Sequence, residues 1–213
     1  GNDNMTGGDG NDNIGAVVIA IAGGVITAAP EAGNDTFEGG AGDDSISGGQ
    51  DSDSLIGGGG NDFISDGSYT LNPLNGQFQF TGVQNDLDTL VGGVGNDIYF
   101  IDRFNRVTEV QDTIIELADE GTDTVFYSGN DPAELTYVLG DNLENLTLGE
   151  NGAALNGIGN ALANVITGNG LDNELRGLDG NDLVSGGDGN DTVNGNVGAD
   201  TIYGGMGLDF LMG

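Results

Sequence analysis

A nine-residue repeat constrains the fold of this chain more than any other feature. Toward the end of the sequence a large apolar residue returns every nine positions, and an aspartate stands two positions before most of these residues. The apolar positions are Ile166, Leu175, Val184, Val193, Ile202 and Leu211, and the aspartates are Asp182, Asp191, Asp200 and Asp209. Glycines crowd the positions just before each aspartate. A fixed offset between aspartate and apolar residue over many copies favours stacked structural units over a flexible linker.

Composition narrows the chemistry that such a repeat can support. The chain of 213 residues has 43 glycines, 35 acidic residues and only 3 basic ones, which gives a formal net charge of −32. This charge excludes a nucleic-acid surface or an anionic membrane as partner and attracts cations. Without cysteine or histidine, the chain has no Ser-His-Asp or Cys-His centre and no soft ligand for zinc, iron or copper, so we expect no enzyme activity. The remaining oxygen donors suit calcium.

The repeat comes in blocks, which predict three parts. We expect a first repeat block over residues 1–100, interrupted by insertions at 16–32 and 66–82. Residues 101–158 form a metal-poor spacer of β-strands, and residues 159–213 resume the repeat. The apolar insertion at 16–32 is too short for a membrane helix of about 20 residues and reads as two short strands. The insertion at 66–82 reads as a surface loop or hairpin.

Each nonamer divides into a glycine-rich turn and a minimal strand with one inward side chain. Such a strand buries almost nothing alone, so successive turns must stack. Two nonamers per coil would place Val184 and Ile202 on one wall and Leu175, Val193 and Leu211 on the opposite wall. Each coil would then use 18 residues and rise about 4.8 Å, the spacing of paired strands.

Stacking brings aspartates of successive coils together. The predicted neighbours are Asp182 with Asp200, Asp191 with Asp209, Asp35 with Asp53, and Asp44 with Asp62. Without a cation these pairs repel one another. Calcium takes 6 to 8 oxygen ligands at about 2.3 to 2.6 Å, which two carboxylates and several main-chain carbonyls can supply. The spacing therefore predicts calcium between adjacent loops.

Some copies depart from the pattern. Asn164 and Asn173 stand where other copies have aspartate, and we expect these turns to close through side-chain hydrogen bonds to the backbone, without metal. Asp51 and Asp86 replace the glycine at the fourth position of their repeats. We expect distorted loops or weaker sites there.

The nonamer G-G-D-G-N-D-T-V-N at residues 186–194 resembles the repeat of the RTX, or hemolysin-type, calcium-binding proteins that bacteria secrete. Other clear copies begin at Gly7, Gly39, Gly57 and Gly92. The resemblance implies an all-β fold: a right-handed parallel β-roll or β-helix solenoid with calcium ions between stacked glycine-rich loops. It implies metal ligands at the sixth position of each repeat, which are Asp3, Asp12, Asp35, Asp44, Asp53, Asp62, Asp88, Asp97, Asp182, Asp191, Asp200 and Asp209.

The same resemblance implies type I export as an unfolded chain, calcium-triggered folding outside the cell, and a secreted or surface-displayed location. We carry two hypotheses for the function. The first is a non-catalytic scaffold or stalk segment of a large adhesin or surface-layer-like protein, which would contact itself, a cell surface or a carbohydrate. The second is a calcium-binding export and folding module attached to a secreted hydrolase or toxin.

Overall fold

The computed structural model describes most of the chain. The described residues are 4–10, 13–15, 33–67, 69–71, 78–80, 87–101, 112–128, 136–150 and 156–213. Within these ranges all regular elements are strands, and no helix is long and apolar enough to cross a membrane. The chain forms two compact units, residues 1–115 and 116–213. The division at residues 100 and 158 expected from the repeat blocks stays a prediction.

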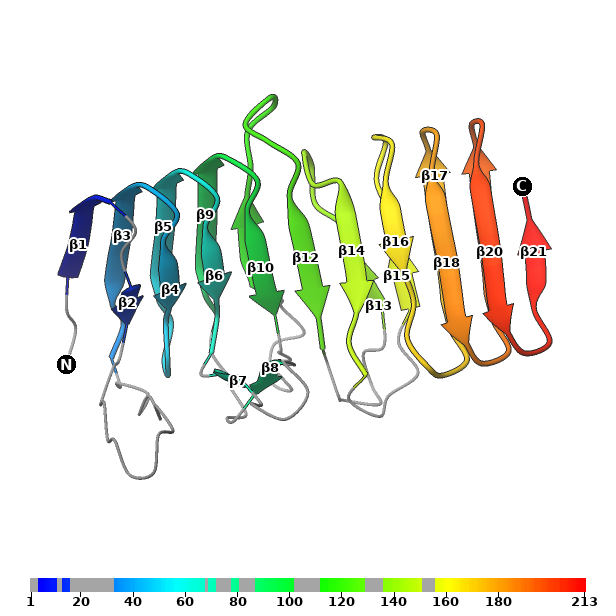
Figure 1. Ribbon diagram of the computed structural model, residues 1–213, viewed down its shortest axis with the longest axis horizontal. Helices are drawn as coiled ribbons and strands as arrows, with labels where there is room; N and C mark the ends of the chain where they lie inside the picture. The colour runs from blue at the N-terminus through cyan, green and yellow to red at the C-terminus, as the bar shows by residue number, and fades with distance from the viewer. Residues whose placement is uncertain are drawn as a thin grey trace. The chain divides into compact units, whose positions relative to one another are not determined.

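The first unit holds two parallel ladders of strands (Figure 1). One ladder contains, in order, β1 (Asn4–Asp9), β3 (Thr36–Ala41), β5 (Ser54–Gly59), β9 (Thr89–Val94) and β11 (Thr113–Ile115). The other contains β2 (Asn13–Gly15), β4 (Ser45–Ser47), β6 (Phe63–Ser65) and β10 (Ile98–Ile101). The chain alternates between the ladders, so each full coil contributes one strand to each.

The second unit repeats this arrangement. One ladder contains β12 (Thr124–Tyr127), β14 (Asn145–Leu148), β16 (Val165–Thr167), β18 (Leu183–Asp188) and β20 (Thr201–Met206). The other contains β13 (Thr136–Val138), β15 (Asn156–Ile158), β17 (Glu174–Asp179), β19 (Thr192–Val197) and β21 (Phe210–Met212). The described part of the predicted spacer therefore contains paired parallel strands.

The strand register confirms that two nonamers make one coil. Phe37 pairs with Leu55, which lies two nonamers later in the sequence. In the second unit Val184 pairs with Ile202 in one ladder, and Leu175 pairs with Val193 in the other. The prediction of an all-β parallel solenoid is confirmed, and the apolar positions face each other from two walls.

The apolar ladder forms a thin core. Leu55, Ile64, Val184 and Val193 are fully buried, and each such side chain contributes about 1.5 to 3 kcal/mol relative to leaving it in water. Leu211 was expected in the same wall, but 47% of its surface is exposed. The reason is that β21 pairs with β19 and with no strand on its other side among the described residues.

The two predicted insertions have different outcomes. Strands β7 (Tyr69–Leu71) and β8 (Phe78–Phe80) pair antiparallel within residues 66–82, which agrees with a hairpin, one of the two forms expected there. The insertion at 16–32 lies outside the described residues.

Candidate metal sites

The loops between the two ladders owe their shape to residues with positive φ. The second and fourth positions of a nonamer adopt it, for example Gly40 at 115° and Gly42 at 129°. Glycine has no Cβ to oppose this conformation. Asp51, the fourth-position residue that departs from the pattern, keeps the same kind of turn with φ 74°. Asp86 lies outside the described residues.

The sixth-position carboxylates form a hydrogen-bonded ladder from coil to coil. In each pair the backbone N–H of the earlier aspartate donates to Oδ1 of the later one. The distances are 2.8 Å for Asp35 to Asp53, 2.8 Å for Asp44 to Asp62, 3.0 Å for Asp182 to Asp200 and 3.1 Å for Asp191 to Asp209. The four pairs expected from the spacing therefore lie next to one another.

Two further pairs span the hairpin insertion. Asp53 donates its N–H to Oδ1 of Asp88 at 2.6 Å, and Asp62 donates to Oδ1 of Asp97 at 2.7 Å. The carboxylate ladder thus continues although the coil that contains the hairpin is longer. Asp3 and Asp12 lie outside the described residues.

The second carboxylate oxygen faces a different environment. Oδ2 is buried and has no hydrogen-bond partner among the described residues in Asp62, Asp182, Asp191 and Asp200. A buried anionic oxygen without a partner costs several kcal/mol, so a site of this kind requires a proton or a cation.

Main-chain oxygens converge on the same place. A Cβ added to Gly57, the first glycine of its repeat, would lie 2.7 Å from the carbonyl oxygen of Gly92 and closer still to Oδ2 of Asp62. In the second unit a Cβ on Gly177 would lie 2.7 Å from the Gly195 carbonyl oxygen and against Oδ2 of Asp182. The first glycine therefore leaves room for a carboxylate oxygen and a carbonyl oxygen from the next coil.

Electrostatics in these loops disfavour the charged, metal-free state. Burial raises the pKa of Asp62, Asp182 and Asp191 above the ordinary aspartate value. The backbone hydrogen bond that each accepts acts in the opposite direction. Carboxylates of adjacent coils raise the pKa further: Asp200 acts on Asp182, and Asp209 acts on Asp191.

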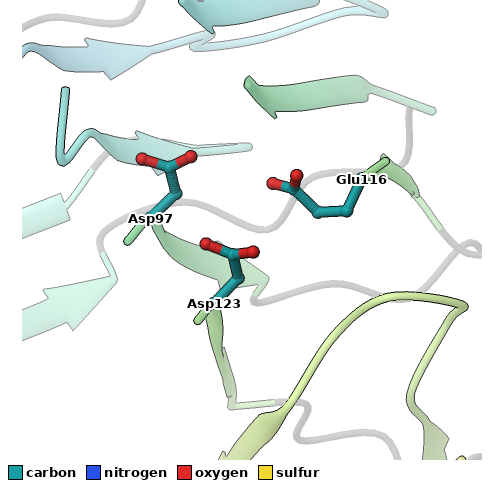
Figure 2. A group of neighbouring side chains, drawn as sticks. All are labelled: Asp97, Glu116 and Asp123. Atoms are coloured by element: carbon teal, nitrogen blue, oxygen red, sulfur yellow. The ribbon is translucent and has the colours of Figure 1, made fainter. Parts of the chain in front are cut away.

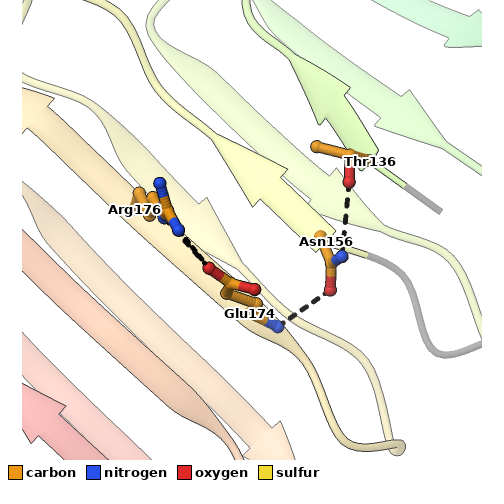
Figure 3. A network of polar contacts seen from close by, with 4 residues as sticks. All are labelled: Thr136, Asn156, Glu174 and Arg176. Carbon is orange, nitrogen blue, oxygen red and sulfur yellow. Dashed lines mark hydrogen bonds and ion pairs between the residues drawn. The ribbon is translucent and has the colours of Figure 1, made fainter.

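The described part of the chain offers almost no positive charge to offset these carboxylates. Arg176 is the single cationic side chain there, and it pairs with Glu174 on the surface. Figure 3 shows this ion pair beside Asn156, whose Oδ1 accepts the Glu174 N–H at 3.0 Å. Since neither partner belongs to a loop carboxylate pair, no cationic side chain in the described ranges neutralises those pairs.

These features fit calcium. Calcium binds oxygen ligands in a flexible geometry, and each stacked loop pair presents two carboxylates and glycine carbonyls without nitrogen or sulfur donors. Asp35, Asp44, Asp53, Asp62, Asp88, Asp97, Asp182 and Asp191 are buried. Asp200 and Asp209 are partly exposed.

Two acidic residues that the nonamer pattern did not predict take the same position in a coil. Oδ1 of Asp112 accepts the Asp88 N–H at 3.0 Å, and Oε2 of Glu144 accepts the Asp123 N–H at 2.8 Å. Both precede an apolar residue by two positions. This offset from an acidic to an apolar residue could have pointed to them, but neither residue has the upstream glycines that mark a nonamer.

Buried acidic side chains also occur where the second unit begins. Glu116 and Asp123 are both buried, and their carboxylate oxygens lie within 4.8 Å of one another. Figure 2 draws these two side chains; Asp97, drawn with them, belongs to the first unit.

The two Asn side chains make the hydrogen bonds to the backbone that were expected of them. Asn164 donates its side-chain Nδ2 to the carbonyl oxygens of Leu143 and Glu144, each at 3.2 Å. Asn173 accepts the Asn169 N–H at its Oδ1, at 2.8 Å. The prediction that these turns close by side-chain hydrogen bonds to the backbone is confirmed.

Together, the parallel ladders and oxygen-lined loops define a calcium-binding β-roll. The family model of the RTX calcium-binding nonapeptide repeat matches the chain in four copies, at residues 31–64, 85–105, 158–193 and 185–213. Because these matches cover more than half of the sequence, the chain belongs to the RTX calcium-binding nonapeptide repeat family. Its repeats bind several calcium ions. No curated protein and no solved structure matches the chain.

Proposed function

We propose that this chain is a non-catalytic scaffold segment of a large extracellular protein and folds when calcium fills its loops outside the cell. The twelve sixth-position aspartates named from the sequence are the proposed ligands. The carrying observation is the buried Oδ2 atom of Asp62, Asp182, Asp191 and Asp200, which has no hydrogen-bond partner among the described residues. A divalent cation bound between the two carboxylates of a loop pair would offset their repulsion and the cost of burying the Oδ2 atoms.

The difference in calcium concentration between the inside and the outside of a cell would determine where the chain folds. Extracellular modules bind calcium with dissociation constants of about 10⁻⁴ to 10⁻³ M, far above the concentration inside a cell. A chain with a net charge of −32 repels itself until cations bind. Binding to the folded state alone then shifts the equilibrium toward the β-roll.

The coils that lack the full nonamer support a scaffold role over that of an export and folding module. The coils without the full nonamer are held by side-chain ladders: Asn156 donates Nδ2 to Oγ1 of Thr136 at 3.3 Å, and Asn145 donates to Oγ1 of Thr124 at 3.1 Å (Figure 3 shows the first). Side-chain bonds of this kind join neutral groups and need no metal ion.

Circular dichroism and light scattering test this proposal in two steps. In EDTA the chain should give a coil-like far-UV spectrum, and millimolar Ca²⁺ should restore the β signal, whereas Mg²⁺ should not. An unchanged spectrum would overturn calcium-coupled folding. Calcium-dependent oligomers would support the scaffold role, and a strictly monomeric calcium-bound form would favour the alternative, a folding module of a secreted hydrolase or toxin.

A further inference from the structure

Two loops of the second unit have asparagine in place of aspartate at the sixth position and close through asparagine side chains. In the first Asn loop, residues 159–164, the Asn160 N–H donates to Oδ1 of Asn164 at 2.8 Å. Nδ2 of Asn164 donates back to Oδ1 of Asn160 at 3.1 Å, and Leu162 donates its N–H to the same oxygen at 2.9 Å. The two amides therefore lock the turn reciprocally.

The second Asn loop, residues 168–173, repeats this network nine residues later. The Asn169 N–H donates to Oδ1 of Asn173 at 2.8 Å, and Nδ2 of Asn173 donates to Oδ1 of Asn169 at 3.0 Å. Leu171 donates its N–H to Oδ1 of Asn169 at 3.1 Å. The recurrence of three equivalent bonds in both loops indicates a repeated motif of its own.

The backbone of the Asn loops also differs from that of the aspartate loops. In the loop at residues 177–182 the second and fourth positions, Leu178 and Gly180, have φ values of 80° and 132°. Neither Asn160 nor Leu162 at the equivalent positions has a positive φ. The Asn loop thus turns its N–H groups toward its own side-chain oxygens, as in an Asx turn.

The amides reach back to the preceding coil. Nδ2 of Asn160 donates to the carbonyl oxygens of Gly140 at 2.8 Å and Leu143 at 2.7 Å. Nδ2 of Asn169 donates to the Gly149 carbonyl oxygen at 2.9 Å. These amide bonds join neutral groups and require no cation. One further bond to the preceding coil, from the Gly170 N–H to Oε2 of Glu150 at 3.0 Å, is exposed.

On the other side the Asn loops receive the first aspartate loops. Asn164 donates its backbone N–H to Oδ1 of Asp182 at 2.8 Å, and Asn173 donates to Oδ1 of Asp191 at 2.8 Å. The donors sit on loops that are already closed by amides. Asp182 and Asp191 therefore meet fixed hydrogen-bond donors before calcium is present.

We propose that the two Asn loops are a calcium-independent template on which the calcium-dependent coils of the second unit assemble. In this arrangement Asn160 and Asn169 are positioning residues that hold Asn164 and Asn173 in place. The inference rests on the proposed calcium-coupled folding and adds the place where folding of this unit starts. In a stack whose coils contact only their neighbours, an ordered coil lowers the cost of adding the next one.

Hydrogen exchange of the full chain in EDTA tests the proposal first. The backbone amides of Asn164 and Asn173 and their segment, residues 156–176, should be protected, whereas residues 35–62 of the first unit should exchange quickly. Calcium should then extend protection to residues 177–212. Fast exchange over 156–176 in EDTA, with folding still restored by calcium, would overturn the template and leave calcium-coupled folding intact. Uniform protection in EDTA would overturn both.

The double variant Asn160→Ala/Asn169→Ala provides the second arm. It should lose protection in EDTA and raise the calcium midpoint for the second unit roughly three- to fivefold, because the hydrogen bonds that order the template are lost and their effect is shared among several ions. The first unit should keep its midpoint. An unchanged midpoint for the second unit would contradict the template.

Two single variants separate the template from general destabilisation. Asn181→Ala removes an exposed interloop bond, that of Oδ1 with the Ala199 N–H at 2.9 Å, and should leave protection in EDTA unchanged. Asn164→Asp replaces the donating amide by a carboxylate and should make protection of residues 156–176 depend on calcium. Equal loss of protection in both variants would overturn the assigned role.

Discussion

The backbone N–H of Asp44 donates to Oδ1 of Asp62 across one coil at 2.8 Å, while Oδ2 of Asp62 has no hydrogen-bond partner in the described part of the chain. One oxygen of the carboxylate thus fixes the stacking, and the other is left for a cation. This division explains why the same residue serves both the fold and the metal site. It also means that removing the charge affects the metal-free and the calcium-bound states in opposite directions.

Asp182→Asn should show this reversal. The amide keeps an oxygen that can accept the Asn164 N–H but removes a buried charge beside Asp200. We expect the calcium midpoint of the second unit to rise roughly tenfold, or about 1.4 kcal/mol, because a carboxylate ligand is lost. The metal-free chain should gain β structure. Isothermal titration and circular dichroism in EDTA measure the two effects.

Asp188→Asn is the matched control for that change. Asp188 is exposed in an adjoining loop, so the same loss of charge should change neither quantity by more than a small, salt-dependent amount. If Asp182→Asn and Asp188→Asn lowered calcium affinity equally, net charge alone would account for binding.

Glycine substitutions test the oxygen-lined gap. Gly57→Ala places a methyl group against Oδ2 of Asp62 and the Gly92 carbonyl oxygen, and we expect a loss of about 2 to 3 kcal/mol in stability with calcium, as for an overpacked core. Gly59→Ala meets no atom within 4 Å and should be neutral or slightly stabilising. Thermal unfolding at saturating calcium compares the two. Equal melting temperatures would contradict the close approach at Gly57.

Lowering the pH should stabilise the metal-free fold, whereas it should weaken calcium binding. Burial raises the pKa of Asp62, Asp182 and Asp191 in the folded chain above the unfolded value of about 3.9. The folded state then binds more protons, so the metal-free fold is most stable below the unfolded pKa and loses stability as pH rises through the folded pKa. In EDTA the β signal should grow as the pH falls from neutral toward the unfolded pKa of about 3.9.

Calcium binding should weaken over the same pH interval, because protons compete for the carboxylates. Calcium titrations at pH 7 and pH 5 check this, with sodium chloride held constant. Metal-free β signal that falls on acidification would contradict the sign of the pKa shifts.

The repeat allowed much of the fold to be predicted, because its nine-residue period gives the strands and loops and two such periods give one coil of the stack. The offset between Asp182 and Val184 predicted both the loop and the inward strand residue, and the pairing of Val184 with Ile202 follows from two nonamers per coil. The break in the repeat at residues 66–82 predicted a loop or hairpin, and β7 and β8 pair antiparallel there.

Other features could not be predicted from the repeat, because they depend on contacts between residues that do not follow its nine-residue spacing. Asp112 and Glu144 take the aspartate position in their coils, but their upstream residues lack the glycines of a nonamer. Asn160 and Asn169 occupy glycine positions of the repeat, and their role appears only when Asn164 and Asn173 fold back onto them. The exposure of Leu211 likewise depends on a neighbouring strand and not on the residue itself.

The most direct test of calcium-dependent stacking is the anomalous scattering of a calcium-soaked or calcium-grown crystal of the full chain. An ion is expected between the loops at residues 177–182 and 195–200, with Asp182, Asp200 and glycine carbonyl oxygens at about 2.3 to 2.6 Å. A folded chain that shows no ion there at millimolar calcium would contradict the central claim that calcium holds the carboxylates of successive coils together.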